Sequence, residues 1–118
     1  MYRDDIAIAA VEAETDRVTA AKATDELLTL QGVRASFVLF KHGTGVNLSA
    51  RSLGEINVQL IMEKLGGGGH FTSAAAQTDD PLAEVLARVR KLVKEYMERE
   101  EEERKQKMTR TQEIELIR

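Results

Sequence analysis

The sequence predicts an α/β fold, with a mixed β-sheet of four to five strands, helices packed on it and a long C-terminal helix. Short apolar segments rich in β-branched residues alternate with segments of helical period. All eight glycines lie within residues 1–80, where a small α/β domain needs its turns. Residues 81–118 contain no glycine and are typical of one continuous helix. A length of 118 residues favours a single domain.

The N-terminal part predicts a strand followed by a helix. Residues 6–11 form a short apolar run that favours a buried strand. Thr15 and Asp16 are both good N-cap residues for a helix over residues 17–31, and Gly32 stands where a C-cap glycine is expected. The apolar face of this helix is rich in small residues and comprises Val18, Ala20, Ala23, Leu27 and Leu30.

Residues 35–41 and 46–51 predict two strands of a hairpin. The segment 42–45 between them supplies two glycines for a four-residue loop. Successive side chains of a strand point to opposite faces. The polar residues Asn47, Ser49 and Arg51 are therefore expected on one face of the second strand. The apolar residues Val46, Leu48 and Ala50 are expected on the other.

The remaining residues predict two helices with a last strand between them. Asn57 can cap a helix whose apolar stripe ends at Leu65, and Gly66 ends that helix. A short segment through Gln77 can form the last strand, and Pro81 is suited to the first turn of the terminal helix. The apolar stripe of the terminal helix comprises Leu82, Val85, Leu86, Val89, Leu92, Val93, Tyr96 and Met97.

Composition excludes several classes of protein. The chain is 42% hydrophobic and 31% charged, as folded domains are, and its net charge of −3 provides no overall basic surface for nucleic acid. Without cysteine, disulfides and thiolate metal sites are excluded. No apolar stretch approaches the length of a membrane span, so we expect no membrane contact by this chain. The acidic start, residues 1–5, does not resemble a signal peptide.

The most informative feature is the run Gly66, Gly67, Gly68 and Gly69, followed at once by His70. Each ordered glycine costs about 0.5–1 kcal/mol relative to alanine, so a run of four suggests close approach of the backbone to a ligand. Consecutive N–H groups can form a nest that binds an anion, and the His70 ring can donate to the same anion. The alternative is a flexible linker. The spacing matches neither a P-loop nor a dinucleotide fingerprint.

Arg51 is the natural partner of this predicted phosphate site. It ends a strand on the polar face, shortly before the helix that leads into the glycines. A guanidinium group matches the geometry of phosphate oxygens. The alternative is a surface arginine that forms an ion pair with Glu55 or Glu63.

These residues resemble a known family. The string Ser49-Ala50-Arg51-Ser52, then Asn57, then the glycine run with His70 and the small residues 73–76, is similar to the DHH-associated C-terminal domain. That domain has a Ser-x-Arg strand end followed by a Gly-Gly-Gly-His loop. The string from Ser49 to Gln77 resembles cyclic-di-AMP phosphodiesterases of the GdpP/YybT type. The resemblance covers about residues 5–97.

The resemblance implies that two domains have different roles. A preceding DHH domain would hold two Mn²⁺ ions and hydrolyse cyclic-di-AMP to pApA, on the cytoplasmic side of the membrane. This chain lacks an Asp-His-His triplet. It would therefore hold no cofactor, be inactive alone and bind a cyclic or linear dinucleotide against the DHH domain. The residues implied in binding are Ser49, Arg51, Gly66, Gly67, Gly68, Gly69 and His70.

Residues 1–97 are expected to form the substrate-binding domain and residues 98–118 a charged helical extension. Two other functions stay open. One is a nucleic-acid-binding module of a single-strand exonuclease or oligoribonuclease of the same superfamily, although aromatic residues for stacking are few. The other is a protein that self-associates as a homodimer, or binds a partner, through the C-terminal helix. A regular heptad pattern is missing from that helix.

Overall fold

The computed structural model describes the backbone of residues 5–117 and the side chains of residues 5–108. Its sheet has five strands in the order β1-β2-β3-β5-β4; β1 and β2 are parallel and the other neighbours are antiparallel. The predicted α/β class, the mixed sheet and the long C-terminal helix are confirmed. The elements are β1 (Ile6–Glu14), α1 (Arg17–Leu28), β2 (Ala35–His42), β3 (Gly45–Ser52), α2 (Val58–Glu63), β4 (Gly68–His70), β5 (Ser73–Thr78) and α3 (Leu82–Ile117).

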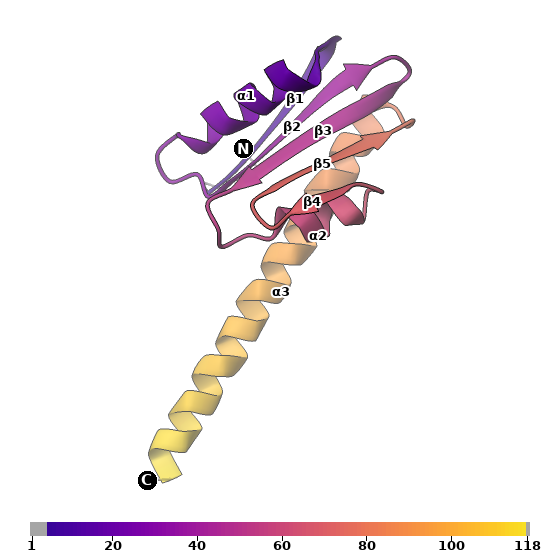
Figure 1. The fold of residues 1–118 in the computed structure, drawn as a ribbon. Helices are drawn as coiled ribbons and strands as arrows, with labels where there is room; N and C mark the ends of the chain where they lie inside the picture. Colours follow the sequence, from indigo (N-terminus) through magenta and orange to yellow (C-terminus); the bar gives the residue numbers. More distant parts are fainter. Residues whose placement is uncertain (1–4, 118) are drawn as a thin grey trace.

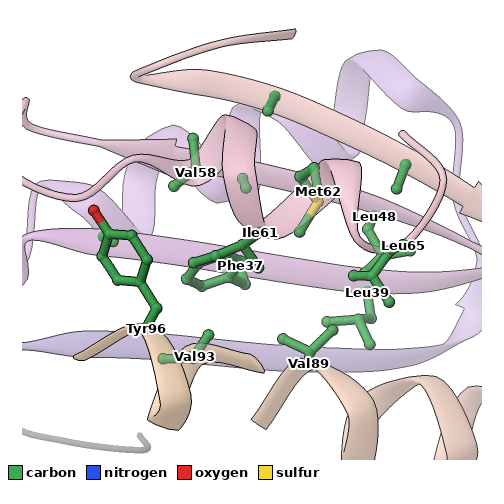
Figure 2. Close-up of a cluster of buried hydrophobic side chains, with 14 of the residues drawn as sticks. Phe37, Leu39, Leu48, Val58, Ile61, Met62, Leu65, Val89, Val93 and Tyr96 are labelled. Carbon is green, nitrogen blue, oxygen red and sulfur yellow. The ribbon is translucent and has the colours of Figure 1, made fainter. Parts of the chain in front are cut away.

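The helices cover the two faces of the sheet unequally (Figure 1). On one face α1 packs against β2 and β3, while α2 and the first half of α3 lie on the opposite face. The larger core forms between the sheet and α2 and α3, and it contains Phe37, Leu39, Leu48, Ile61, Met62 and Val89 (Figure 2). The smaller core lies under α1 and contains Ala20, Val38 and Phe40. A single helix leaves part of its face of the sheet uncovered.

Helix α1 begins as the sequence predicts but ends earlier. The Asp16 carboxylate accepts a hydrogen bond from the Thr19 N–H at 2.8 Å, which caps the first turn. The helix ends at Leu28 rather than at residue 31, because the N–H groups of Thr29 and Leu30 bond to carbonyls only three residues back. Gly32, at φ +84°, belongs to the turn that follows the helix.

The strands differ from the prediction mainly at their ends. Strand β1 runs on to Glu14 with an irregularity after Val11. In the hairpin His42 pairs with Gly45, so the connection consists of Gly43 and Thr44 rather than four residues. One strand was predicted after the glycine run. The structure has β5 there and also a short strand β4, which the last two glycines of the run form together with His70.

Helix α3 buries one face of its first half, and its described side chains after Met97 are exposed. The Val85 N–H donates to the Pro81 carbonyl at 3.0 Å. Pro81 therefore lies just before the first turn of the helix. Met97 is 7% exposed, whereas the side chains of residues 98–108 are all exposed. No described helix combines the length and the apolar character needed to cross a membrane. Self-association through this helix stays a prediction.

Tyr96 joins α3 to the start of α2. Its hydroxyl oxygen accepts a hydrogen bond from the Asn57 N–H at 2.9 Å, and Asn57 is the N-cap of α2. Figure 2 shows the ring rising from α3 beside Val58 and Phe37. Burial raises the pKa of Tyr96 above its ordinary value of 10.0. The folded protein therefore favours the protonated phenol.

We expect Tyr96→Phe to lower the free energy of unfolding by about 1 kcal/mol at neutral pH, because the Asn57 N–H loses its partner. The raised pKa adds a pH dependence. Above pH 10 the unfolded state releases the phenol proton first, so the contribution of Tyr96 to stability is intact below the unfolded pKa and is lost as pH rises through the folded one. Urea unfolding at pH 7 and above pH 10 measures both effects. If the free energy of unfolding of the Phe variant falls equally steeply above pH 10, the pH dependence does not come from Tyr96.

Candidate functional site

A cavity of about 480 Å³ lies on the face of the sheet that α1 covers only in part. Ligand pockets commonly have volumes of about 300–1,000 Å³. Helix α1 forms one wall, β3 and β5 form the floor, and β4 closes the other side. The lining residues are Arg17, Ala21, Phe40, Asn47, Leu48, Ser49, Arg51, Gly67, Gly68, Gly69, Ser73, Ala74, Ala75, Ala76 and Gln77.

The register of β3 and β5 explains what lines the floor. Ser49 pairs with Ala75 and Arg51 with Ser73, and directly opposed side chains share a face. The side chains of Ala75 and Ser73 are short, so they leave space between the sheet and α1. The neighbours Leu48 and Ala50 belong to the core on the other face. The predicted separation of polar and apolar faces along β3 is therefore confirmed.

Arg51 stands at the edge of the cavity and is held by α1. Its Nε lies 3.2 Å from Oδ1 of Asp25, and its Nη1 donates to the Ala50 carbonyl at 2.9 Å. Nη1 also lies 3.5 Å from the Ser49 hydroxyl. The sequence pointed to Glu55 or Glu63 as an alternative partner, but the ion pair forms with Asp25, because α1 lies over β3. Glu55 pairs with Arg34 instead.

The first two glycines of the run end a helix. The Gly67 N–H donates to the Met62 carbonyl at 2.8 Å and the Gly66 N–H to the Glu63 carbonyl at 3.1 Å, with Gly66 at φ +83°. This pattern is a Schellman motif, which satisfies the last carbonyls of α2. The prediction that consecutive N–H groups form an anion-binding nest is wrong for these two residues, because the helix already uses their donors.

The other constraint on the glycines is close contact with β5. A Cβ on Gly67 would lie 2.1 Å from the Ala75 carbonyl oxygen, and one on Gly69 would lie 2.6 Å from the Ala74 Cα. Gly68 differs, since a Cβ there would meet nothing within 4 Å. Gly68 lines the cavity, so the fold itself does not require the missing side chain at this position.

The predicted binding residues divide into two groups. Ser49, Arg51 and glycines 67–69 line one cavity. Gly66 and His70 are exposed and do not line it. His70 is the last residue of β4 and pairs with Ser73, which does line the cavity. A role for His70 in binding stays a prediction.

Sequence analysis missed four residues at this site: Arg17, Asp25 and Gln77 altogether, and Asn47 as a binding candidate. Asn47 shares the polar face of β3 with Ser49 and Arg51, so the alternation of residues could have included it. Its Oδ1 is buried without a hydrogen-bond partner among the described residues. Arg17, Asp25 and Gln77 reach the site through tertiary packing, for which the sequence carries no local signal.

The described residues contain no group of three or more histidine, cysteine, aspartate or glutamate side chains that could hold a metal ion. This agrees with the chemistry of the cavity lining, which offers hydroxyl, amide and guanidinium groups. These groups suit hydrogen bonding to an anion or a heterocycle more than metal coordination.

Comparison with protein families identifies the domain. The family model of the DHHA1 domain matches residues 3–99. The chain belongs to the DHHA1 family. It is 54% identical over 85 residues to the cyclic-di-AMP phosphodiesterase GdpP of Geobacillus thermodenitrificans, covering 70% of this chain and 13% of the relative. The matched part of this chain thus spans only a small part of that relative's length.

Two further relatives carry similar names. GdpP of Bacillus subtilis is 45% identical over 104 residues, covering 83% of this chain and 16% of the relative. The cyclic-di-AMP phosphodiesterase PdeA of Listeria monocytogenes is 51% identical over 83 residues, covering 68% of this chain and 13% of the relative. The predicted resemblance to cyclic-di-AMP phosphodiesterases of the GdpP type is therefore confirmed.

Solved structures share the fold at low sequence identity. The C-Ala domain of Aquifex aeolicus alanyl-tRNA synthetase superposes with a TM-score of 0.59 and 14% identity, covering 73% of this chain and 88% of that one. The pGpG-specific phosphodiesterase PggH of Vibrio cholerae superposes with a TM-score of 0.54 and 17% identity, covering 77% and 32%. At such identities these likenesses establish the fold alone.

We expect Gly67→Ala to destabilise the protein and Gly68→Ala to leave its stability almost unchanged. A methyl group on Gly67 collides with β5, and such overpacking costs about 1–3 kcal/mol. A methyl group on Gly68 has room and should change stability by less than about 0.5 kcal/mol. Urea unfolding of the two variants measures the difference. Equal losses of stability would show that the cavity beside Gly68 is filled in the folded protein.

We expect the pair of Arg51 and Asp25 to contribute little to stability. The side chain of Asp25 is 63% exposed and that of Arg51 22%, and exposed ion pairs contribute about 0–1 kcal/mol. A double-mutant cycle with Asp25→Asn and Arg51→Gln measures their coupling in urea unfolding. A coupling of about 2 kcal/mol or more would mean that Arg51 mainly fastens α1 to the sheet.

Proposed function

We propose that this chain is the substrate-binding domain of a DHH-type phosphodiesterase, and that its cavity binds a phosphate group of cyclic-di-AMP or of the linear product pApA. The observation that supports this most directly is the Arg51 guanidinium at the edge of the cavity, beside the Ser49 hydroxyl. The substrate class comes from relatives named cyclic-di-AMP phosphodiesterases, of which this chain spans 13–16%.

Arg51 is suited to phosphate because it is oriented before a ligand arrives. A guanidinium carries five N–H donors, and the contacts to Asp25 and Ala50 leave donors for a ligand. The net charge of the whole chain is −3, so an anion has to be attracted by a local cation. Holding the guanidinium in place lowers the entropy lost on binding.

The other residues of the proposed phosphate site offer space and neutral donors. Ser49 is 7% exposed, and its hydroxyl can donate to a phosphate oxygen. Gly68 leaves room for the ligand to approach β4, as the open space at its Cβ position indicates. We propose that His70 meets the ligand from the end of β4, next to Ser73, outside the cavity itself.

Hydrolysis is assigned to the DHH domain that the resemblance implies, together with its two Mn²⁺ ions. The described residues of this chain contain no cluster of side chains suited to metal binding. Its proposed role is to position the phosphodiester, which contributes to catalysis by orientation. Within this proposal residues 1–97 bind substrate and residues 98–118 form a separate helical extension. We further propose that the site lies on the cytoplasmic side of the membrane in the whole protein.

Calorimetric titration of this chain with cyclic-di-AMP and with pApA tests the proposal. A charge-assisted hydrogen bond contributes about 1.5–3 kcal/mol, so Arg51→Ala should weaken binding roughly ten- to a hundredfold. Arg88→Ala is the matched control, because Arg88 forms an ion pair of the same 3.2 Å length with Asp80, away from the cavity. It should leave the affinity unchanged.

Three outcomes decide the matter. Weaker binding by Arg51→Ala alone supports the proposed site. Equal affinities in wild type and Arg51→Ala would place the ligand elsewhere on the chain. If the wild type does not bind at millimolar ligand, the titration is repeated on a protein that carries the DHH domain as well. No binding there overturns the proposed function.

A further inference from the structure

The exposed part of α3 carries one large apolar side chain among charged ones. Met108 is 59% exposed, and it lies on the part of the helix that leaves the domain after Met97. A helix of 3.6 residues per turn places positions 97, 101, 104 and 108 within about 60° of one another around its axis. One stripe along α3 therefore contains Met97, Glu101, Arg104 and Met108.

A small pocket lies at the base of this stripe. Its volume is about 140 Å³, and its lining residues are Arg34, Met97, Glu100, Glu101 and Arg104. Met97 supplies the apolar part of the lining, and Arg34 is held in place by ion pairs with Asp5 and Glu55. The flexible side chain of a methionine is suited to an irregular space of this kind.

The stripe is complementary to a second copy of itself that runs in the opposite direction. In an antiparallel pair centred between Glu101 and Arg104, the Glu101 carboxylate lies opposite the partner's Arg104. The same register places Met108 opposite the partner's Met97, next to the small pocket. A two-fold axis repeats each contact, so both ends of the stripe are used in both copies.

The charges on the rest of the exposed helix favour the same orientation. Residues 98–103 contain five glutamates and one arginine, a net charge of −4, and residues 104–107 contain three basic residues and no acidic one. Antiparallel pairing places the acidic block of one copy beside the basic block of the other, whereas parallel pairing would place like charges together. Complementary charges of this kind mainly determine orientation and register.

Ion pairs within one helix account for only part of this pattern. Oε1 of Glu101 lies 3.8 Å from Nζ of Lys105, and pairs four residues apart stabilise an isolated helix slightly. Arg104, by contrast, forms no ion pair with any described residue, so its guanidinium is free to pair with a second chain. Pairs within the helix also give no reason for an apolar residue at position 108.

We propose that α3 pairs in antiparallel orientation with α3 of a second copy of this chain, with Met108 of each copy in the pocket beside the partner's Met97. Packed helices cross at about 20° or 50°, so the partner's residues after 108 diverge from the buried half of α3. The contact is small and largely polar, so we expect a dissociation constant between about 1 µM and 1 mM. This dimer does not depend on the proposed phosphodiesterase function.

Sedimentation equilibrium of the whole chain, at concentrations up to about 1 mM, tests the proposal. The mass should rise with concentration from 13.1 kDa towards twice that value. Met108→Ala should raise the dissociation constant roughly tenfold, because a two-fold dimer loses the contact twice. Gln106→Ala is the matched control, since residue 106 is exposed on the side of the helix opposite the stripe and its loss should leave the constant unchanged.

Reversing the two charges of the stripe tests the register. Glu101→Arg and Arg104→Glu each place like charges opposite each other in a dimer of identical chains, so each variant alone should stay monomeric. An equimolar mixture of the two should dimerise, because every arginine of one variant then faces a glutamate of the other. The helix of each variant is unchanged by mixing, so the recovery can come only from pairing between chains.

Each result of these measurements supports or overturns the proposal. A wild type that keeps a mass of 13.1 kDa at millimolar concentration overturns it. So does a dimer that neither Met108→Ala nor the charge reversals weaken, because that dimer would use another surface. If both reversals abolish association and their mixture does not restore it, the proposal is wrong as well. The substituted side chains are exposed and lie outside the core, so the variants should keep the fold.

Discussion

The contact between the glycine run and β5 is the constraint on which the rest of the site depends. Helix α2 ends in a Schellman motif at Gly66, and the chain must then pass against the backbone of Ala75 and Ala76. Only a residue without a side chain fits there. This contact brings β4 alongside β5 and closes one side of the cavity. The glycines therefore build the wall of the site, and only Gly68 leaves space that the fold does not require.

Because the helices cover the two sheet faces unequally, the larger core lies on one face and the cavity on the other. On one face α2 and α3 bury the larger core, including Phe37 and Met62. On the other face α1 covers β2 and part of β3, and the polar side chains of β3 line the cavity beside it. The same strand thus presents Leu48 to the core and Ser49 to the cavity.

The sequence predicted the layers and the polar face well, because both depend on local periodicity. Alternation along residues 46–51 was enough to place Ser49 and Arg51 on one face. The glycine run was harder, since a helix cap, a close backbone contact and an anion nest all favour glycine. Here the hydrogen bonds of Gly66 and Gly67 excluded the nest at these two residues. Asp25 and Gln77 could not be predicted, because their positions depend on how α1 docks and how β5 is registered against β3.

The shape of α3 has a mechanical consequence. The helix continues as a single rod after Met97, and the molecule measures 62 × 27 × 22 Å (Figure 1). Some 20 residues of helix extend roughly 30 Å, so a tilt of about 10° at the base would displace the tip by about 5 Å. Tyr96 fastens that base to the N-cap of α2, whose other end leads into the glycine run. The exposed part of α3 is thus connected, through Tyr96 and α2, to the glycine segment that lines the cavity.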